Sequence, residues 1–209
     1  MRRLFALSLL LPLAACIAAA DEASLRLIPQ EDRFIARGVI DGSTPEVVRR
    51  ALAAHPELRT VVMEYVPGSR DDDANLLASR MLRQAGVTMI VPEGGLVASG
   101  GTDMFLAGVE RRTGPGACLG VHSWASGFGP FGTEGRDLPR NDPEHRPYLD
   151  YYADMGVDAA FYWYTLEAAD AADIHYMSPA ELHRFGMTTA PVPTGAASYD
   201  RCEALHLAQ

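Results

Sequence analysis

After its first twenty residues, the chain alternates between strand-like and helix-like stretches, and this alternation constrains the fold more than any other feature. Stretches rich in β-branched, aromatic and other apolar residues predict strands at 33–40, 60–66, 87–92 and 117–124. Helix-like stretches lie between them. Strands separated by helices favour a parallel or mostly parallel sheet that is covered by helices. We therefore expect a single α/β domain over residues 21–209.

Helix-start signals delimit some of the expected helices. Ser43 followed by Glu46 three residues later fits a capping box, in which the side chain and main chain of the two residues bond reciprocally. The same pattern recurs at Ser178 and Glu181, with Gly186 as a stop signal. Both segments therefore predict helices.

Three further stretches predict helices, and one predicts a loop. Aspartates at the start and arginines near the end match the helix dipole over 71–84. Two more helices are expected at 145–155 and 157–169, the second with a cluster of aromatic residues typical of packing. Glycines and prolines over 127–142 predict no regular element, so this stretch is either a lid beside a site or a plain surface loop.

The first twenty residues have the pattern of a secretory signal peptide. Arg2 and Arg3 precede an apolar stretch that is too short to be a permanent membrane anchor. Cleavage after the small residues 18–20 fits the ordinary rule. Alternatively, residues 13–16 fit the bacterial lipobox, in which Cys16 is lipidated and becomes the new N-terminus. Both alternatives predict a periplasmic protein, and the second adds a lipid anchor in the outer membrane.

The overall charge argues against one class of partner. The formal net charge is -9 and the pI is about 5.1, and the sequence has no basic cluster that could neutralise phosphates. We therefore expect no nucleic-acid partner. The histidines are scattered without a recognised metal-ligand spacing, and no phosphate-binding loop of the Walker type occurs, so we expect neither a metal nor another cofactor.

The cysteines agree with export. Once Cys16 is removed or lipidated, Cys118 and Cys202 remain as an even pair in an oxidising compartment. We expect them to form a disulfide that ties the C-terminal tail to the core. The alternative is two independent thiols, with Cys118 buried in a strand.

Three short segments carry the groups that acyl transfer requires, which are a nucleophile, a base and N–H groups directed at an oxyanion. Ser99 lies among small residues between a strand and a short helix, and Gly100 after it could donate its N–H. His122 and Gly68 each follow the end of a strand. Each residue also has an ordinary structural explanation, with Ser99 as a helix cap, His122 as a packing residue and Gly68 as part of a Pro-Gly turn.

The order and spacing of these segments resemble the Clp-type serine peptidases of the Clp protease/crotonase superfamily. In that family a strand runs into a Pro-Gly-Gly turn, similar to residues 67–69 here, and a later strand leads to Ala-Ser-Met-Gly, similar to residues 98–101. The family's histidine ends a strand at a similar separation, and here His122 lies 23 residues after Ser99. The stretch 177–186 resembles the family's Met-Ser-Ala-Glu-Glu-Ala…Tyr-Gly. The similarity covers nearly the whole mature chain, and the segment before His122 resembles an exported, uncharacterised bacterial branch.

The resemblance implies a Clp/crotonase-like fold with Ser99 as nucleophile and His122 as its general base. It also implies that Gly68 and Gly100 form the oxyanion hole. The family's triad aspartate lies four residues before the motif serine, and this chain has isoleucine there. Asp173, one residue earlier, is the nearest candidate. A Ser-His pair without a carboxylate, or another acid such as Asp170, stays open.

The implied function is an exported serine hydrolase, a peptidase that acts on a peptide or protein substrate through an acyl-enzyme. The superfamily commonly assembles into rings or stacked oligomers, so the resemblance also implies a homo-oligomer. The missing aspartate and the altered turn at Ser69 favour an alternative. In that alternative the chain is a periplasmic or lipid-anchored binding or scaffold protein that keeps the fold but has little turnover.

Overall fold

The computed structural model describes residues 23–127, 132–193 and 199–207, with only the main chain of Tyr199. The predicted signal peptide over 1–20, including the candidate lipidation site Cys16, lies outside these residues and stays a prediction. Within the described ranges, no helix is long and apolar enough to cross a membrane.

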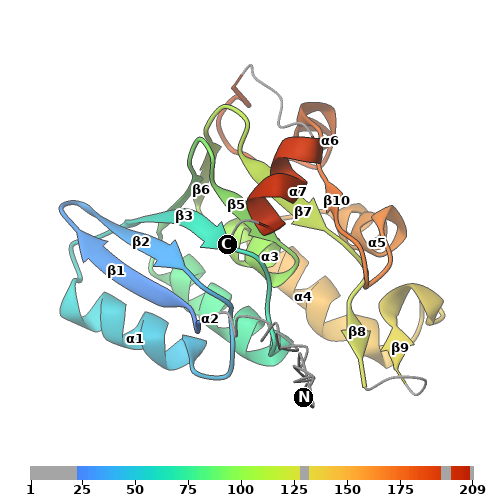
Figure 1. Ribbon diagram of the computed structural model, residues 1–209. Helices are drawn as coiled ribbons and strands as arrows, with labels where there is room; N and C mark the ends of the chain where they lie inside the picture. The colour runs from blue at the N-terminus through green and yellow to red at the C-terminus, as the bar shows by residue number, and fades with distance from the viewer. Residues whose placement is uncertain (1–22, 128–131, 194–198, 208–209) are drawn as a thin grey trace, which may run out of the picture.

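An eight-stranded, mostly parallel sheet organises the described part of the chain (Figure 1). The strands run in the spatial order β1-β2-β3-β5-β7-β10, and β4 and β6 branch off beside β3. The pairs β1–β2 and β7–β10 are antiparallel, and the other pairs are parallel. The strands are β1 (Arg26–Gln30), β2 (Arg33–Arg37), β3 (Thr60–Val66), β4 (Thr88–Val91), β5 (Leu96–Ala98), β6 (Glu110–Thr113), β7 (Cys118–Val121) and β10 (His175–Tyr176). The predicted α/β class with a mostly parallel sheet is confirmed.

Strand β3 has two neighbours on the same side, and this division shapes the site. Its first part pairs with β4 from Thr60 to Val62, and its last residues, Tyr65 and Val66, pair with β5. Strand β5 in turn pairs with β7. Because β3, β5 and β7 are parallel neighbours, their carboxyl ends reach the same edge of the sheet.

Helices cover both faces of the sheet. Figure 1 shows α1 to α4 along one face and α7 over β5 and β7 on the other. The helices are α1 (Thr44–Ala54), α2 (Asp72–Gln84), α3 (Gly100–Leu106), α4 (Arg146–Met155), α5 (Ala159–Ala168), α6 (Pro179–Arg184) and α7 (Tyr199–Leu207). Side chains alternate between the two faces of a strand. Accordingly, Val97 of β5 joins the main core, while Leu96 and Ala98 join a smaller cluster under α7.

A disulfide between Cys118 and Cys202 fastens the C-terminal helix to the sheet. Cys118 is the first residue of β7 and Cys202 lies in α7, with their Cα atoms 5.6 Å apart. Both residues are fully buried in the smaller cluster. The predicted disulfide is therefore confirmed, and it ties the C-terminal tail to the core as expected.

The two predicted capping boxes have different outcomes. At α1 the prediction is wrong, because the Ser43 hydroxyl donates to Asp41 Oδ1 (2.6 Å) and the Glu46 carboxylate pairs with arginines of its own helix. The Asp41 carboxylate also accepts the Ser43 N–H (2.9 Å), which the Glu46 side chain would accept in a capping box. At α6 the box is present, because the Glu181 N–H donates to Ser178 Oγ (3.3 Å) and the Ser178 N–H donates to the Glu181 carboxylate (2.7 Å).

The glycine-rich stretch 127–142 contains more order than expected. Strand β9 (Thr133–Glu134) pairs with β8 (Ala125–Ser126), and a 3-10 helix, η2 (Gly135–Asp137), follows. A Cβ at Gly135 would lie 2.5 Å from the Trp124 ring, so the absent side chain allows this segment to pack closely on the indole. The prediction of no regular element was wrong for these residues, and residues 128–131 lie outside the described ranges. A second 3-10 helix, η3 (Pro143–His145), leads into α4.

Candidate active site

Three adjacent strand ends bring the predicted site residues to one edge of the sheet. Gly68 follows β3, Ser99 follows β5 and His122 follows β7. In the register of β5 and β7, Ala98 faces Gly120, and the Ser99 N–H donates to the Gly120 carbonyl (3.0 Å). Ser99 therefore lies between the segment that carries Gly68 and the strand end that carries His122.

Ser99 has a backbone conformation that is rare for a residue with a side chain. Its φ is +52° and its ψ is −129°, and it joins β5 to the first residue of α3. Such a conformation costs about 1–3 kcal/mol and persists only where the surroundings impose it. The hydroxyl makes no capping bond to α3, so the simple explanation of Ser99 as a side-chain cap is not what the structure shows. A sharp strand-to-helix turn of this kind exposes the nucleophile in the α/β-hydrolases.

Glycines allow the surrounding segments to approach Ser99. A Cβ at Gly68 would lie 3.5 Å from Ser99 Cβ and 3.9 Å from Ser99 Oγ. A Cβ at Gly100 would lie 2.5 Å from Ser69 Oγ, and one at Gly101 would lie 1.9 Å from the Val66 carbonyl oxygen. Within the described chain, the N–H groups of Gly68 and Gly100 donate no hydrogen bond, so both remain able to donate to an oxyanion.

His122 lines the same pocket as Ser99 and Gly100. Its ring atom Nδ1 is buried and has no hydrogen-bond partner among the described residues. Burial lowers the pKa of His122, while the Ser123 backbone and the negative charges of Asp72, Glu134 and Asp170 act in the opposite direction. A lowered pKa keeps the imidazole neutral near pH 7, which is the form that accepts a proton.

Two carboxylates line the pocket, and the sequence analysis did not single out either of them as a site residue. Asp72 accepts hydrogen bonds from the Ser69 hydroxyl and from Tyr148 Oη (2.6 Å). Asp103 accepts one from Tyr152 Oη (2.5 Å). Desolvation raises the pKa of Asp103 to about 7, the Tyr152 hydrogen bond opposes this rise, and the charge of Asp72 adds to it. For Asp103 the sequence does contain a signal, which is its position four residues after Ser99. Residues four apart lie on the same side of a helix.

Stacked aromatic rings form one wall of the pocket. The Tyr148 ring stacks on Trp124 and on Tyr162, with 5.6 Å between ring centroids in each pair. Trp124 Nε1 donates to Tyr162 Oη (2.8 Å), which fixes the two outer rings. The aromatic cluster predicted for α5 therefore packs as expected, and one of its members, Tyr162, also lines the pocket.

Asp173 is not brought to this pocket. It is exposed, its carboxylate accepts the N–H of Ile174 (2.8 Å), and it lines a separate pocket together with residues of α7. Asp170 also bonds within its own turn, where its carboxylate accepts the Ala172 N–H (3.1 Å). The geometry thus gives no support to Asp173 as the acid that orients His122. The physical reason is the one-residue offset, which places Ile174 rather than an aspartate against β7, with its Cγ2 2.6 Å from where a Cβ of Gly120 would lie.

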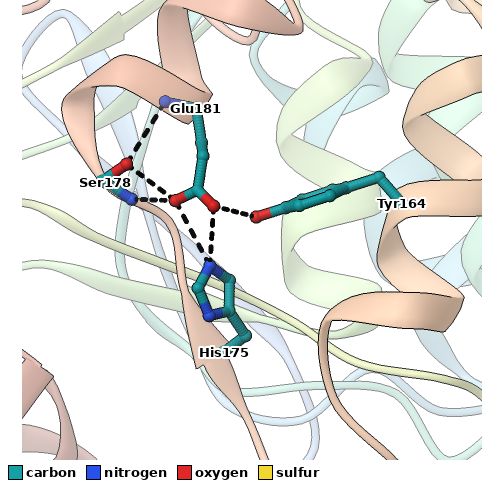
Figure 2. A network of polar contacts seen from close by, with 4 residues as sticks. All are labelled: Tyr164, His175, Ser178 and Glu181. Atoms are coloured by element: carbon teal, nitrogen blue, oxygen red, sulfur yellow. Dashed lines mark hydrogen bonds and ion pairs between the residues drawn. The ribbon is translucent and has the colours of Figure 1, made fainter.

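The late motif at 177–186 builds a structural network instead. Figure 2 shows the Glu181 carboxylate at its centre, between Tyr164, His175 and Ser178. It accepts hydrogen bonds from Tyr164 Oη (2.9 Å) and lies 3.1 Å from His175 Nε2. Burial raises the pKa of Glu181, but these hydrogen bonds together lower it to about 2. The network joins α5, β10 and α6 and does not include Ser99 or His122.

The side chains of the described segments offer no cluster of three or more histidine, cysteine, aspartate or glutamate residues that could hold a metal ion.

Comparison with known proteins shows the fold. No protein-family profile and no curated protein matches the sequence. Two similar solved structures are mutants of the 1510-N membrane-bound stomatin-specific protease. A serine-to-alanine mutant is 16% identical with a TM-score of 0.52, and the match covers 80% of this chain and 81% of that one. A lysine-to-alanine mutant in complex with a substrate peptide is 18% identical with a TM-score of 0.51, over 78% of this chain and 75% of that one.

The chain has a Clp-type serine protease fold. At this identity the likeness concerns the fold alone, and it gives no support to the exported branch.

Proposed function

We propose that this chain is an exported serine hydrolase of the peptidase type, with Ser99 as nucleophile and His122 as general base. The observation that carries the proposal is the arrangement at the sheet edge. A strained serine at a strand-to-helix turn shares a pocket with a histidine of lowered pKa, and the N–H groups of the adjacent Gly100 and the nearby Gly68 have no acceptor in the described chain. The similarity in fold to a protease that binds a substrate peptide agrees with a peptide as substrate.

In the proposed reaction, Ser99 Oγ attacks the carbonyl carbon of the scissile bond while its proton passes to His122. The N–H groups of Gly68 and Gly100 donate hydrogen bonds to the carbonyl oxygen and stabilise the negative charge that develops on it. The tetrahedral intermediate collapses as the C–N bond breaks and His122 returns the proton to the leaving amine. Water, deprotonated by His122, then attacks the ester carbonyl and releases Ser99 and the carboxylic acid product.

The choice of base follows from the composition. All basic residues of the sequence other than histidine are arginines, and the chain contains no lysine. Arginine stays protonated in proteins and cannot accept a proton from serine. A serine-lysine pair is therefore impossible here, and His122 is the histidine that lines the pocket with Ser99.

A specific observation favours a second candidate function, a binding or scaffold protein with little turnover. No described carboxylate reaches Nδ1 of His122, which is the atom that an orienting acid would bind. In serine proteases, loss of that acid's function lowers kcat by about four orders of magnitude without destroying the site. A Ser-His pair alone would thus bind a substrate and turn it over slowly.

Labelling with a fluorophosphonate tests the proposal. We expect the wild type to be labelled and the label to be lost in Ser99→Ala and His122→Ala. Ser43→Ala, an exposed serine outside the pocket, and His183→Ala, an exposed histidine, serve as matched controls that should label like the wild type. Folded wild-type protein that never reacts across the titration range of histidine would contradict the hydrolase and favour the binding protein.

Export and anchoring form a separate part of the proposal. The lipobox at residues 13–16 predicts that the protein fractionates with the outer membrane. Cys16→Ser should then release it from the membrane fraction. A protein that is soluble in the periplasm before and after this substitution would instead have lost its signal by ordinary cleavage.

A further inference from the structure

Two buried polar side chains hold the turn of Ser99 from outside the pocket. Asn75 of α2 and Thr102 of α3 are each about 1% exposed, and neither lines the pocket. Asn75 Nδ2 donates to the Gly100 carbonyl (2.9 Å), and Thr102 Oγ1 donates to the Gly120 carbonyl (2.7 Å). Each bond joins segments that are distant in the sequence.

Thr102 connects the nucleophile turn to the strand of the base. The Gly120 carbonyl accepts two hydrogen bonds, one from Thr102 Oγ1 and one from the Ser99 N–H (3.0 Å). The carbonyl would therefore keep a partner if the hydroxyl were absent. Gly120 lies two residues before His122. The bond from Thr102 Oγ1 therefore fixes the spacing between the first turn of α3 and the end of β7.

Asn75 orients the residue that supplies one of the oxyanion donors. A carbonyl in the first turn of a helix normally accepts the N–H four residues later, so the Gly100 carbonyl does not need a side-chain partner. The bond from Asn75 instead fixes the orientation of Gly100, whose own N–H points out of the helix start. The fit is close, since a Cβ at Gly100 would lie 2.9 Å from Asn75 Nδ2.

We propose that Asn75 and Thr102 are positioning residues, which hold Ser99 and the Gly100 N–H in their strained arrangement against His122. A positive φ at a residue with a side chain persists only where neighbouring contacts impose it, and these two bonds act on either side of Ser99. Removal of either bond lets the turn relax, and small displacements of a nucleophile have large effects on rate. The inference rests on the proposed function, because it assigns these residues to the chemistry at Ser99.

Thr102→Val and Asn75→Ala test the inference. Thr102→Val keeps the shape of the side chain and removes only the hydroxyl. We expect the maximal rate of fluorophosphonate labelling to fall by about 10- to 100-fold with a nearly unchanged half-saturating probe concentration. Thr102→Ser, which keeps the hydroxyl, should restore most of the rate. Asn75→Ala should show the same selective loss of rate.

A matched control separates positioning from stability. Thr44→Val also removes a hydroxyl from a fully buried threonine, one that accepts the Asp41 N–H (3.0 Å) at the start of α1 and does not line the pocket. It should lower the free energy of unfolding about as much as Thr102→Val but leave the labelling rate unchanged. Equal losses of rate in the two valine variants, or no loss in Thr102→Val, would overturn the inference.

Hydrogen exchange makes the two proposals separable. The Ser99 amide, which is bonded to Gly120, should exchange faster in Thr102→Val and Asn75→Ala than in the wild type or in Thr44→Val. If the wild type is never labelled but exchange rises in this way, the proposed hydrolase fails and the positioning role stands. If the wild type is labelled and neither rate nor exchange changes in the variants, the hydrolase stands and the positioning role is wrong.

Discussion

The turn of Ser99 and the strand end of His122 lie side by side, but the surrounding chain holds them very differently. Close packing surrounds the serine, with the Ser69 side chain against Gly100 and the Val66 backbone against Gly101, together with buried hydrogen bonds from Asn75 and Thr102. The imidazole of His122 has a buried nitrogen without a partner in the described chain. The nucleophile is thus fixed by close packing and hydrogen bonds from neighbouring segments, whereas the orientation of the base lacks the acid that usually sets it.

The largest expected effect comes from the packing around the serine. Gly101→Ala would place a Cβ 1.9 Å from the Val66 carbonyl oxygen and 3.2 Å from Val66 Cγ1, so α3 or β3 must shift. We expect a loss of about 4 kcal/mol or more in the free energy of unfolding, measured by urea titration. Gly42→Ala, which would meet only the Asp71 carboxylate at 3.2 Å, serves as the control. Equal stability of the two variants would show that the turn of Ser99 is not tightly packed.

The disulfide supports the strand of His122 from the opposite face of the sheet. It closes a long loop, since Cys118 and Cys202 are 84 residues apart. Cys202→Ser should lower the free energy of unfolding by about 2–5 kcal/mol, because a crosslink restricts the unfolded chain. Reduction of the wild type should reproduce the effect. Two free thiols at these positions in folded, unreduced protein would contradict the structure.

Asp103 links the two regions, because it belongs to the helix of Ser99 and lines the pocket of His122. Its pKa of about 7 lies above the ordinary value of 3.8, so between these pH values the folded chain holds a proton that the unfolded chain has released. The free energy of unfolding should therefore fall as pH rises through this window. We expect a fall of about 2 kcal/mol, roughly half of the value of the whole difference between the two pKa values, because Asp103 as a residue is only half-buried.

Asp103→Asn should flatten this pH dependence. Asparagine imitates the protonated carboxyl and can still accept the hydrogen bond from Tyr152 Oη. The measurement is a series of urea titrations from acidic to neutral pH. Asp137→Asn, an exposed aspartate outside the pocket, should keep the slope of the wild type. A slope that survives in Asp103→Asn would have to come from another group and would contradict the assignment to Asp103.

The same difference between the two regions explains what the sequence could predict. Strands rich in β-branched residues and the run of small residues around Ser99 are local patterns, so they located β3, β4 and β7 and the turn that leads into α3, whereas β5 was not among the four predicted strands. Parallel pairing of β3, β5 and β7 then places Gly68, Ser99 and His122 at one edge. Glycines in such a turn indicate close contacts, and the distances show them directly, to side chains at Gly100 and to the Val66 backbone at Gly101.

Other features depend on contacts between distant segments, which local patterns do not report. Strand β10 was not expected, because it has only two residues and pairs with β7 in an antiparallel sense. Helix α7 was not expected either, because the disulfide rather than a local pattern holds it against the sheet. The pocket carboxylates Asp72 and Asp103 looked like ordinary residues of helix starts. Their role in the pocket depends on where α4 places Tyr148 and Tyr152.

The smallest expected effect concerns Asp173, and it bears most directly on how His122 is held. If Asp173 oriented the imidazole, Asp173→Asn would lower the labelling rate of Ser99 by about four orders of magnitude. Because its carboxylate is exposed and bonds to the Ile174 N–H, we expect a change of less than about twofold, within the range of surface substitutions. Asp170→Asn provides the comparison, since the charge of Asp170 acts on His122. A large loss in Asp173→Asn alone would mean that the loop before β10 rearranges to complete a triad, and the base would then be held as firmly as the nucleophile.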